Sequence, residues 1–169
     1  TAANAGASQP HLHTHAIGTS LIPRRLEQLV DHFSRYDMKV QLRNDSDKIL
    51  MLGGCANCLE SRDNRYSSIF RITYNDFCVS FVRPVPDDID YPLQISIIPY
   101  SHCGFFEKMS PMEATSFSQV LHQTMVYVGT LLPNCGYNYE MRQGAWSIHN
   151  RDIYGIEYKD LFHWRFDIY

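Results

Sequence analysis

Short runs of aromatic and branched residues recur through the middle and the end of the chain. They cover residues 68–74, 77–82, 93–99, 137–141 and 162–169. Runs of this length and composition, bounded by turn-forming residues, predict β-strands. Asn75 and Asp76 lie between the first two runs and predict a hairpin there.

Two other segments have the period of a helix. In 23–36, apolar residues recur at every third or fourth position after Pro23, which predicts an amphipathic helix. A second helix is predicted to begin after Ser110, because a serine cap, a proline and a glutamate follow in the order of a capping box, and to end near Leu132. Its predicted apolar face contains Phe117, Val120, Leu121, Thr124, Met125 and Val128.

Strand runs that do not alternate regularly with helices favour an antiparallel sheet with helices packed on it. We therefore predict an α+β domain. The length of 169 residues suits one domain with a substantial core.

Composition and charge argue against several classes of protein. The chain has 15 basic and 18 acidic residues, a net charge of −3, and no long basic block, so we expect no nucleic-acid partner. We expect no membrane span, because polar residues interrupt even the apolar stretch 120–132 and a span needs about 18 apolar residues. The first residue is not Met and no charged-then-apolar leader precedes it, so we expect neither a secretion signal nor an intact start.

Three histidines alternate with other residues near the start of the chain. A strand would place His11, His13 and His15 on one face, where they could meet a single phosphate group. One imidazole can attack phosphorus while another stabilises the charge that develops on the phosphate oxygens. The small residues from Gly6 to Ser8 would let the backbone approach that phosphate. A metal site, a tag remnant or coincidence are the alternatives for the three histidines.

A pair of cysteines, Cys55 and Cys58, has the spacing of half a zinc site. The odd total of five cysteines also favours a reducing compartment over a disulfide framework. His102 and His163 are the best further ligands, because each lies at the end of a predicted strand that could aim it. A Cys2His2 zinc site is predicted; free thiols, a surface His102 or a core His163 are the alternatives. We expect the remaining cysteines to pack in the interior and the remaining histidines to lie on the surface: Cys78, Cys103 and Cys135, and His32, His122 and His149.

The segment Gly6-Ala7-Ser8-x-x-His11-x-His13 resembles the active-site strand of the galactose-1-phosphate uridylyltransferase and ADP-glucose phosphorylase branch of the histidine-triad superfamily. The later motifs also follow in the order of that branch: Cys-x-x-Cys, Ile-Ile-Pro-x-x-His, a capped helix, Tyr-Asn-Tyr and His-Trp. The resemblance implies a HIT-like α+β fold, an antiparallel sheet with two packed helices. It implies that residues 1–20 end a first HIT-like half that is otherwise absent, and that 21–169 form a second half with a zinc site.

The resemblance also implies an activity, nucleotidyl transfer to or from a nucleotide sugar or sugar 1-phosphate, as in galactose metabolism. By analogy, His13 would attack the α-phosphorus and become a covalent nucleotidyl-histidine. Ser8, Gly6 and His15 would contact phosphate, and His11 would be a zinc ligand of the first half. The expected partner is a second copy of the chain or the missing amino-terminal half, and the expected location is the cytoplasm or an organellar matrix.

Two departures from the pattern of the branch keep other functions open. His15 stands where the branch usually has glutamine and histidine-triad hydrolases have histidine, so a nucleotide hydrolase is one alternative. Arg165 follows His163-Trp164 where relatives often have histidine or an apolar residue, so no second active histidine strand is expected in this half. A non-catalytic, zinc-stabilised domain that serves as a subunit or binding module is the other alternative.

Overall fold

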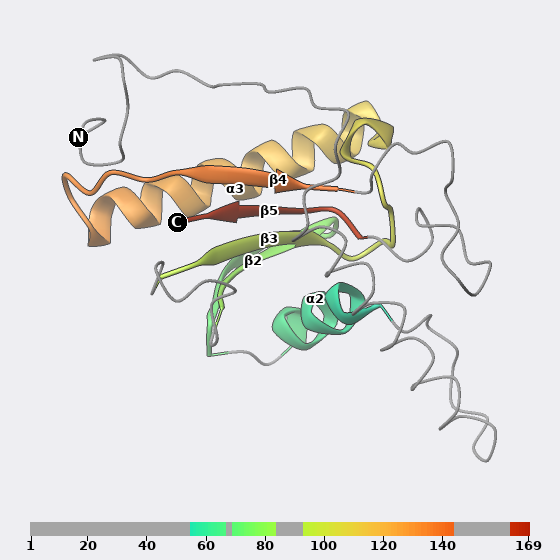
Figure 1. Cartoon of the computed structure of the whole chain (residues 1–169), viewed down its shortest axis with the longest axis horizontal. Helices are drawn as coiled ribbons and strands as arrows, with labels where there is room; N and C mark the ends of the chain where they lie inside the picture. The colour runs from blue at the N-terminus through green and yellow to red at the C-terminus, as the bar shows by residue number, and fades with distance from the viewer. Residues whose placement is uncertain (1–54, 67–68, 84–92, 144–162) are drawn as a thin grey trace, which may run out of the picture.

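An antiparallel sheet of five strands forms the centre of the molecule (Figure 1). The structure is a computed structural model, and it describes residues 55–66, 69–83, 93–143 and 163–169. The strands are β1 (Arg71–Tyr74), β2 (Cys78–Val82), β3 (Ile95–Pro99), β4 (Tyr139–Arg142) and β5 (Arg165–Ile168). Their order in the sheet is β1-β2-β3-β5-β4, and every pair is antiparallel. The predicted α+β class is confirmed.

The predicted hairpin joins β1 to β2, and the side chain of Asn75 holds its turn. Asn75 Oδ1 accepts hydrogen bonds from the backbone N–H groups of Phe77, at 2.9 Å, and Cys78, at 3.0 Å. Asparagine favours such turns because its side chain can satisfy backbone groups one to three residues away. Four of the five predicted runs contain a whole strand, and the fifth, 137–141, contains all of β4 except its last residue, Arg142.

Helix α3 (Pro111–Leu131) begins at the predicted cap and covers one face of the sheet (Figure 1). Ser110 Oγ accepts from the backbone N–H of Glu113 at 3.3 Å, and the Glu113 carboxylate accepts from the backbone N–H of Ser110 at 2.8 Å. This reciprocal pair satisfies backbone donors that a helix start leaves free. The predicted apolar face is also confirmed, since its six residues are buried or packed against the core.

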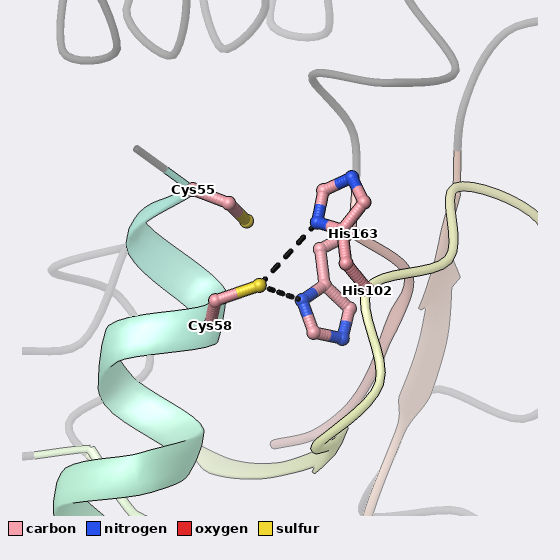
Figure 2. Close-up of side chains that lie close together, drawn as sticks. All are labelled: Cys55, Cys58, His102 and His163. Atoms are coloured by element: carbon pink, nitrogen blue, oxygen red, sulfur yellow. Dashed lines mark hydrogen bonds between the residues drawn. The ribbon is translucent and has the colours of Figure 1, made fainter. Parts of the chain in front are cut away.

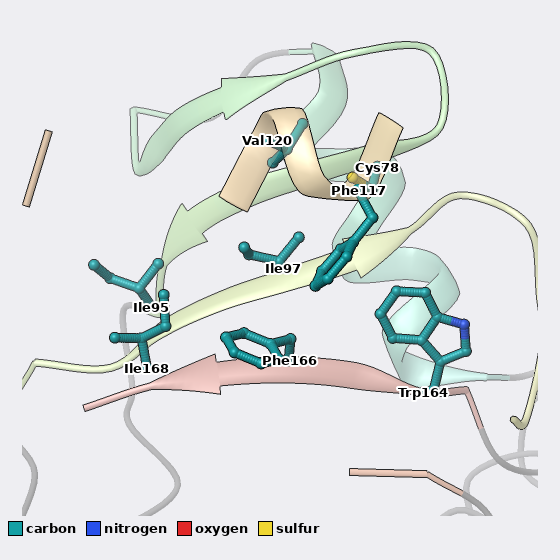
Figure 3. Packing of buried hydrophobic residues seen from close by; sticks show 8 residues of the cluster. All are labelled: Cys78, Ile95, Ile97, Phe117, Val120, Trp164, Phe166 and Ile168. Carbon is teal, nitrogen blue, oxygen red and sulfur yellow. The ribbon is translucent and has the colours of Figure 1, made fainter. Parts of the chain in front are cut away.

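The main hydrophobic core lies between α3 and the sheet (Figure 3). Trp164, which has no exposed surface, is surrounded edge-on by Phe106 and Phe117, with ring centroids 5.1 and 5.6 Å from its own. A hydrogen bond of 2.8 Å from Thr124 to Ser80 satisfies the two buried hydroxyls between helix and sheet. Because Trp164 directly follows His163, this packing anchors the chain beside a predicted metal ligand. The buried residues of the core are Cys78, Ile95, Ile97, Phe117, Val120, Trp164, Phe166 and Ile168.

Helix α2 (Ala56–Tyr66) lies on the other side of the sheet and was not predicted. Its sequence is mostly polar, and its few apolar residues give only a weak signal for a packed helix. The helix predicted over 23–36 and the segment 1–20 lie outside the described residues. No helix in the described ranges is long and apolar enough to cross a membrane.

The remaining cysteines differ in burial. Cys78 is fully buried, and burial raises the pKa of its thiol to about 12. Cys103 is partly buried, whereas Cys135 is exposed, so the prediction that Cys135 packs in the interior was wrong. Cys135 follows Asn134, whose φ of 67° marks a turn after α3, and the turn leaves the thiol at the surface. His122 lies exposed on α3, as expected.

A buried ionic network occupies the sheet where β3, β4 and β5 meet. Asp167 has no exposed surface and accepts hydrogen bonds from Ser96 Oγ and from Arg165 Nε, the latter at 2.9 Å. Arg142 Nε lies 3.2 Å from the same carboxylate. Arg165 is therefore part of the interior, paired with Asp167, and it stabilises the strand that follows His163.

We expect Asp167→Ala to lower the free energy of unfolding by about 3–5 kcal/mol, because it would remove the buried carboxylate that the guanidinium groups of Arg142 and Arg165 share. Urea unfolding monitored by circular dichroism would measure the loss. Asp76→Ala is the control, since Asp76 is exposed and should change stability by no more than about 0.5 kcal/mol. Equal unfolding midpoints for the two variants would contradict a structural role for the network.

Candidate metal centre

Four side chains that are far apart in the sequence meet beside the sheet: Cys55, Cys58, His102 and His163 (Figure 2). Each offers one sulfur or nitrogen atom, and these atoms all lie within 4.8 Å of one another. They are the four residues predicted as zinc ligands. We call this group the Cys2His2 cluster.

Two pairs of elements position the cluster. Cys55 directly precedes α2 and Cys58 lies in its first turn, so a spacing of three residues places both thiols on the same side of the helix. His102 follows β3 and His163 precedes β5; these strands are antiparallel neighbours, so the two histidines lie at the same end of the sheet. A hydrogen bond of 2.9 Å from the backbone N–H of Trp164 to the carbonyl of Cys103 joins the two histidine segments.

Cys58 is the residue of the cluster that lies close to both histidines. Its Sγ lies 3.3 Å from His102 Nδ1 and 3.2 Å from His163 Nδ1, and the two imidazole rings meet edge to face with centroids 5.3 Å apart. Both cysteines and His163 are buried, whereas His102 is exposed. The cluster is therefore closed on the protein side and reaches solvent at His102.

The two thiols differ in their affinity for protons. The pKa of Cys55 is lowered to about 2, chiefly by the hydrogen bond with Cys58 and further by His102 and His163, against the opposing effect of burial. The same hydrogen bond, together with burial, raises the pKa of Cys58 well above its usual range. A bound cation would compete with protons for both thiols.

The donor set fits a tetrahedral metal ion. With metal–sulfur bonds of about 2.3 Å and metal–nitrogen bonds of about 2.0–2.1 Å, neighbouring ligand atoms would be roughly 3.3–3.8 Å apart. The contacts of Cys58 with the two imidazoles, at 3.2 and 3.3 Å, already approach this spacing. Two thiolates and two imidazoles fill all four positions and leave none for a substrate, which is typical of a structural rather than a catalytic site.

The predicted catalytic and phosphate-binding residues lie outside the described residues. These are Gly6, Ser8, His11, His13 and His15. Their roles stay predictions from the sequence.

One buried polar residue of the centre was missed from the sequence. Asn57 lies between the two cysteines, and its side-chain amide donates a hydrogen bond of 2.9 Å to the carbonyl of His163. Its position between two predicted ligands was the only signal in the sequence, and a polar residue there is equally compatible with an exposed loop.

Comparison with known proteins agrees with this fold. No protein-family model matches the chain, and no curated protein sequence matches it. A solved GalT-like protein from Arabidopsis thaliana matches 98% of this chain and 47% of its own, with 21% identity and a TM-score of 0.68. The chain therefore has the fold of this GalT-like protein. The resemblance expected from the sequence is thereby confirmed at the level of the fold.

Two further solved structures support the same fold. An ADP-glucose phosphorylase from Arabidopsis thaliana with bound ADP-glucose matches with 19% identity and a TM-score of 0.60, and a uridylyltransferase with 16% identity and a TM-score of 0.61. Each match covers 88% of this chain and 40% of the solved one. The chain thus spans less than half the length of the structures it resembles.

Proposed function

We propose that this chain belongs to a nucleotidyltransferase that acts on a nucleotide sugar or a sugar 1-phosphate. The observation that carries the proposal is the fold match to an ADP-glucose phosphorylase and a uridylyltransferase. The histidine segment from Gly6 to His15 supports it, because it offers the nucleophile that such a transfer requires. The rest of the nucleotide site would come from an amino-terminal half or from a second copy of the chain.

The proposed reaction is a double displacement at phosphorus. An imidazole nitrogen of His13 bonds to the α-phosphorus while the bond from that phosphorus to the sugar-phosphate oxygen breaks, and the leaving oxygen keeps the electron pair. An oxygen of phosphate or of a sugar phosphate then attacks the same phosphorus and releases His13. His15, Ser8 and the backbone at Gly6 would hold the phosphate oxygens, and His11 would orient the segment or bind a metal ion.

The Cys2His2 cluster would bind zinc and stabilise the fold. Thiolate and imidazole together favour zinc among the common divalent ions, and a site with four protein ligands leaves no position for a reacting water. When bound, the ion would neutralise the thiolates and link the start of α2 to the ends of β3 and β5. Chemistry would then take place at the histidine segment rather than at this metal.

Mass spectrometry of the protein incubated with a nucleotide sugar tests the proposal. The 169-residue chain, alone and within any longer natural protein that contains it, is mixed with ADP-glucose or UDP-glucose, without an acceptor. We expect a covalent nucleotide on the peptide that contains His13, and none in His13→Ala. Turnover without such an adduct would contradict the covalent mechanism, and nucleotide released steadily into water would favour the hydrolase alternative that His15 suggests.

A non-catalytic domain is the second candidate, and Arg165 favours it. This residue stands where the resemblance leads us to expect histidine or an apolar residue, and it is buried and bonded to Asp167, so we expect no second active histidine strand in this half. A subunit or binding module of this kind would keep its metal and show no turnover. Metal content and activity measured on one preparation separate the two candidates.

A further inference from the structure

Asn57 connects the two parts of the Cys2His2 cluster without being a ligand. Its side chain is almost fully buried, at 3% exposure, and its Nδ2 donates to the carbonyl oxygen of His163 at 2.9 Å. The two residues are 106 positions apart in the sequence. This contact therefore joins the first turn of α2 to the segment that enters β5.

The two cysteines form one part of the cluster and the two histidines form the other. Each part is already held together by its own hydrogen bond. The cysteine part is held by the helix, whose first turn includes a bond from the backbone N–H of Leu59 to the carbonyl of Cys55 at 3.3 Å. The histidine part is held by the 2.9 Å bond between Trp164 and Cys103. Neither bond fixes one part relative to the other, whereas the Asn57 bond does.

The ring of His163 lacks the support that metal-bound histidines usually have. A ligand histidine commonly donates its second ring N–H to a carboxylate or a carbonyl, which fixes the orientation of the ring. His163 Nδ1 faces Cys58 at 3.2 Å, while its Nε2 is buried and has no hydrogen-bond partner among the described residues. The position of this ligand is therefore set through its backbone, by Asn57 on its own carbonyl and by the packing of Trp164.

We propose that Asn57 is a positioning residue of the metal centre. It holds the His163 backbone against α2 and so keeps Nδ1 at ligand distance from the ion. The proposal rests on the metal binding proposed above. Without Asn57, the His163 carbonyl would be buried without this donor, and the histidine part could move away from the cysteines.

Release of zinc to a coloured chelator tests this role. The full 169-residue chain is loaded with one equivalent of zinc, and the release rate is followed by absorbance. We expect Asn57→Ala to release zinc about tenfold faster or more than the unmodified chain, the effect typical of losing a residue that supports a metal ligand. Cobalt(II) in place of zinc should show a changed visible spectrum in the variant, because the nitrogen ligand moves.

Thr124→Val is the matched control. It also removes buried side-chain hydrogen bonding, the 2.8 Å contacts of Thr124 Oγ1 with Ser80 Oγ and with the carbonyl of Val120, but on the face of the sheet that packs on α3. We expect this variant to lose stability and to release zinc at the rate of the unmodified chain. Equally fast release from both variants would show that Asn57 acts only through overall stability.

Asn57→Leu keeps the test decisive if Asn57→Ala does not fold, because leucine fills the space of the amide and still lacks the donor. Zinc release as slow as in the unmodified chain from either folded Asn57 variant would overturn the proposal. A different failure belongs to the metal centre itself: an unmodified chain that takes up no zinc would refute the proposed metal binding, and this inference with it.

Discussion

Removing the metal from the zinc-loaded chain is expected to unfold the described domain. Structural zinc sites contribute on the order of 10 kcal/mol, whereas a typical domain is stable by only about 5–15 kcal/mol. The ion would also hold the polar helix α2, whose other contacts include the ion pair of Glu60 with Arg83 at 2.8 Å. Circular dichroism should show a cooperative loss of structure as a chelator removes the ion.

Two cysteine substitutions distinguish the loss of a metal ligand from the loss of a thiol outside the cluster. Cys58→Ser should abolish zinc binding and reproduce the unfolding, because Cys58 contacts both histidines of the cluster. Cys135→Ser should leave metal content and melting temperature unchanged, since that thiol is exposed and outside the cluster. Metal-free protein that keeps its melting temperature would refute a structural role for zinc.

His13→Ala is expected to reduce nucleotidyl transfer by roughly 10⁴-fold or more, because the variant lacks the group that forms the covalent intermediate. Steady-state rates of the natural full-length protein with ADP-glucose and phosphate would measure the loss. The KM should change much less than kcat, since the proposed phosphate contacts of Ser8 and His15 remain. The loss would therefore fall on the chemical step.

The control for this experiment is His122→Ala. His122 is exposed on α3, outside the histidine segment and the Cys2His2 cluster, so turnover should be unchanged. Turnover by His13→Ala comparable to that of the unmodified enzyme would rule out His13 as the nucleophile. It would leave the described fold and the metal centre untouched, because His13 belongs to neither.

The parts of the fold that could be predicted are those with a strong local signal. The strands carry runs of branched and aromatic residues, and α3 carries both a capping box and an apolar face. Helix α2 is mostly polar, with few apolar residues to reveal it, and its first turn contacts the ends of two strands, which is tertiary information. Local patterns decide an element only when tertiary contacts do not override them.

The metal centre could be predicted in part for a similar reason. Cys55 and Cys58 have a recognisable spacing, and the two histidines could be placed because each adjoins a predicted strand. Asn57 could not be found in this way. Its partner is a backbone carbonyl 106 residues away. Every residue has such a carbonyl, so the sequence does not indicate which one accepts the bond.

The position of Trp164 gives the molecule an optical reporter of its own. The indole is buried in the aromatic core, and Trp164 directly follows the candidate metal ligand His163 in the sequence. The chain has only two tryptophans, so Trp146→Phe would leave this indole as the single source of tryptophan emission. Its fluorescence would respond both to loosening of the core and to quenching by a cobalt ion in the cluster, so that one signal follows folding and metal occupancy together.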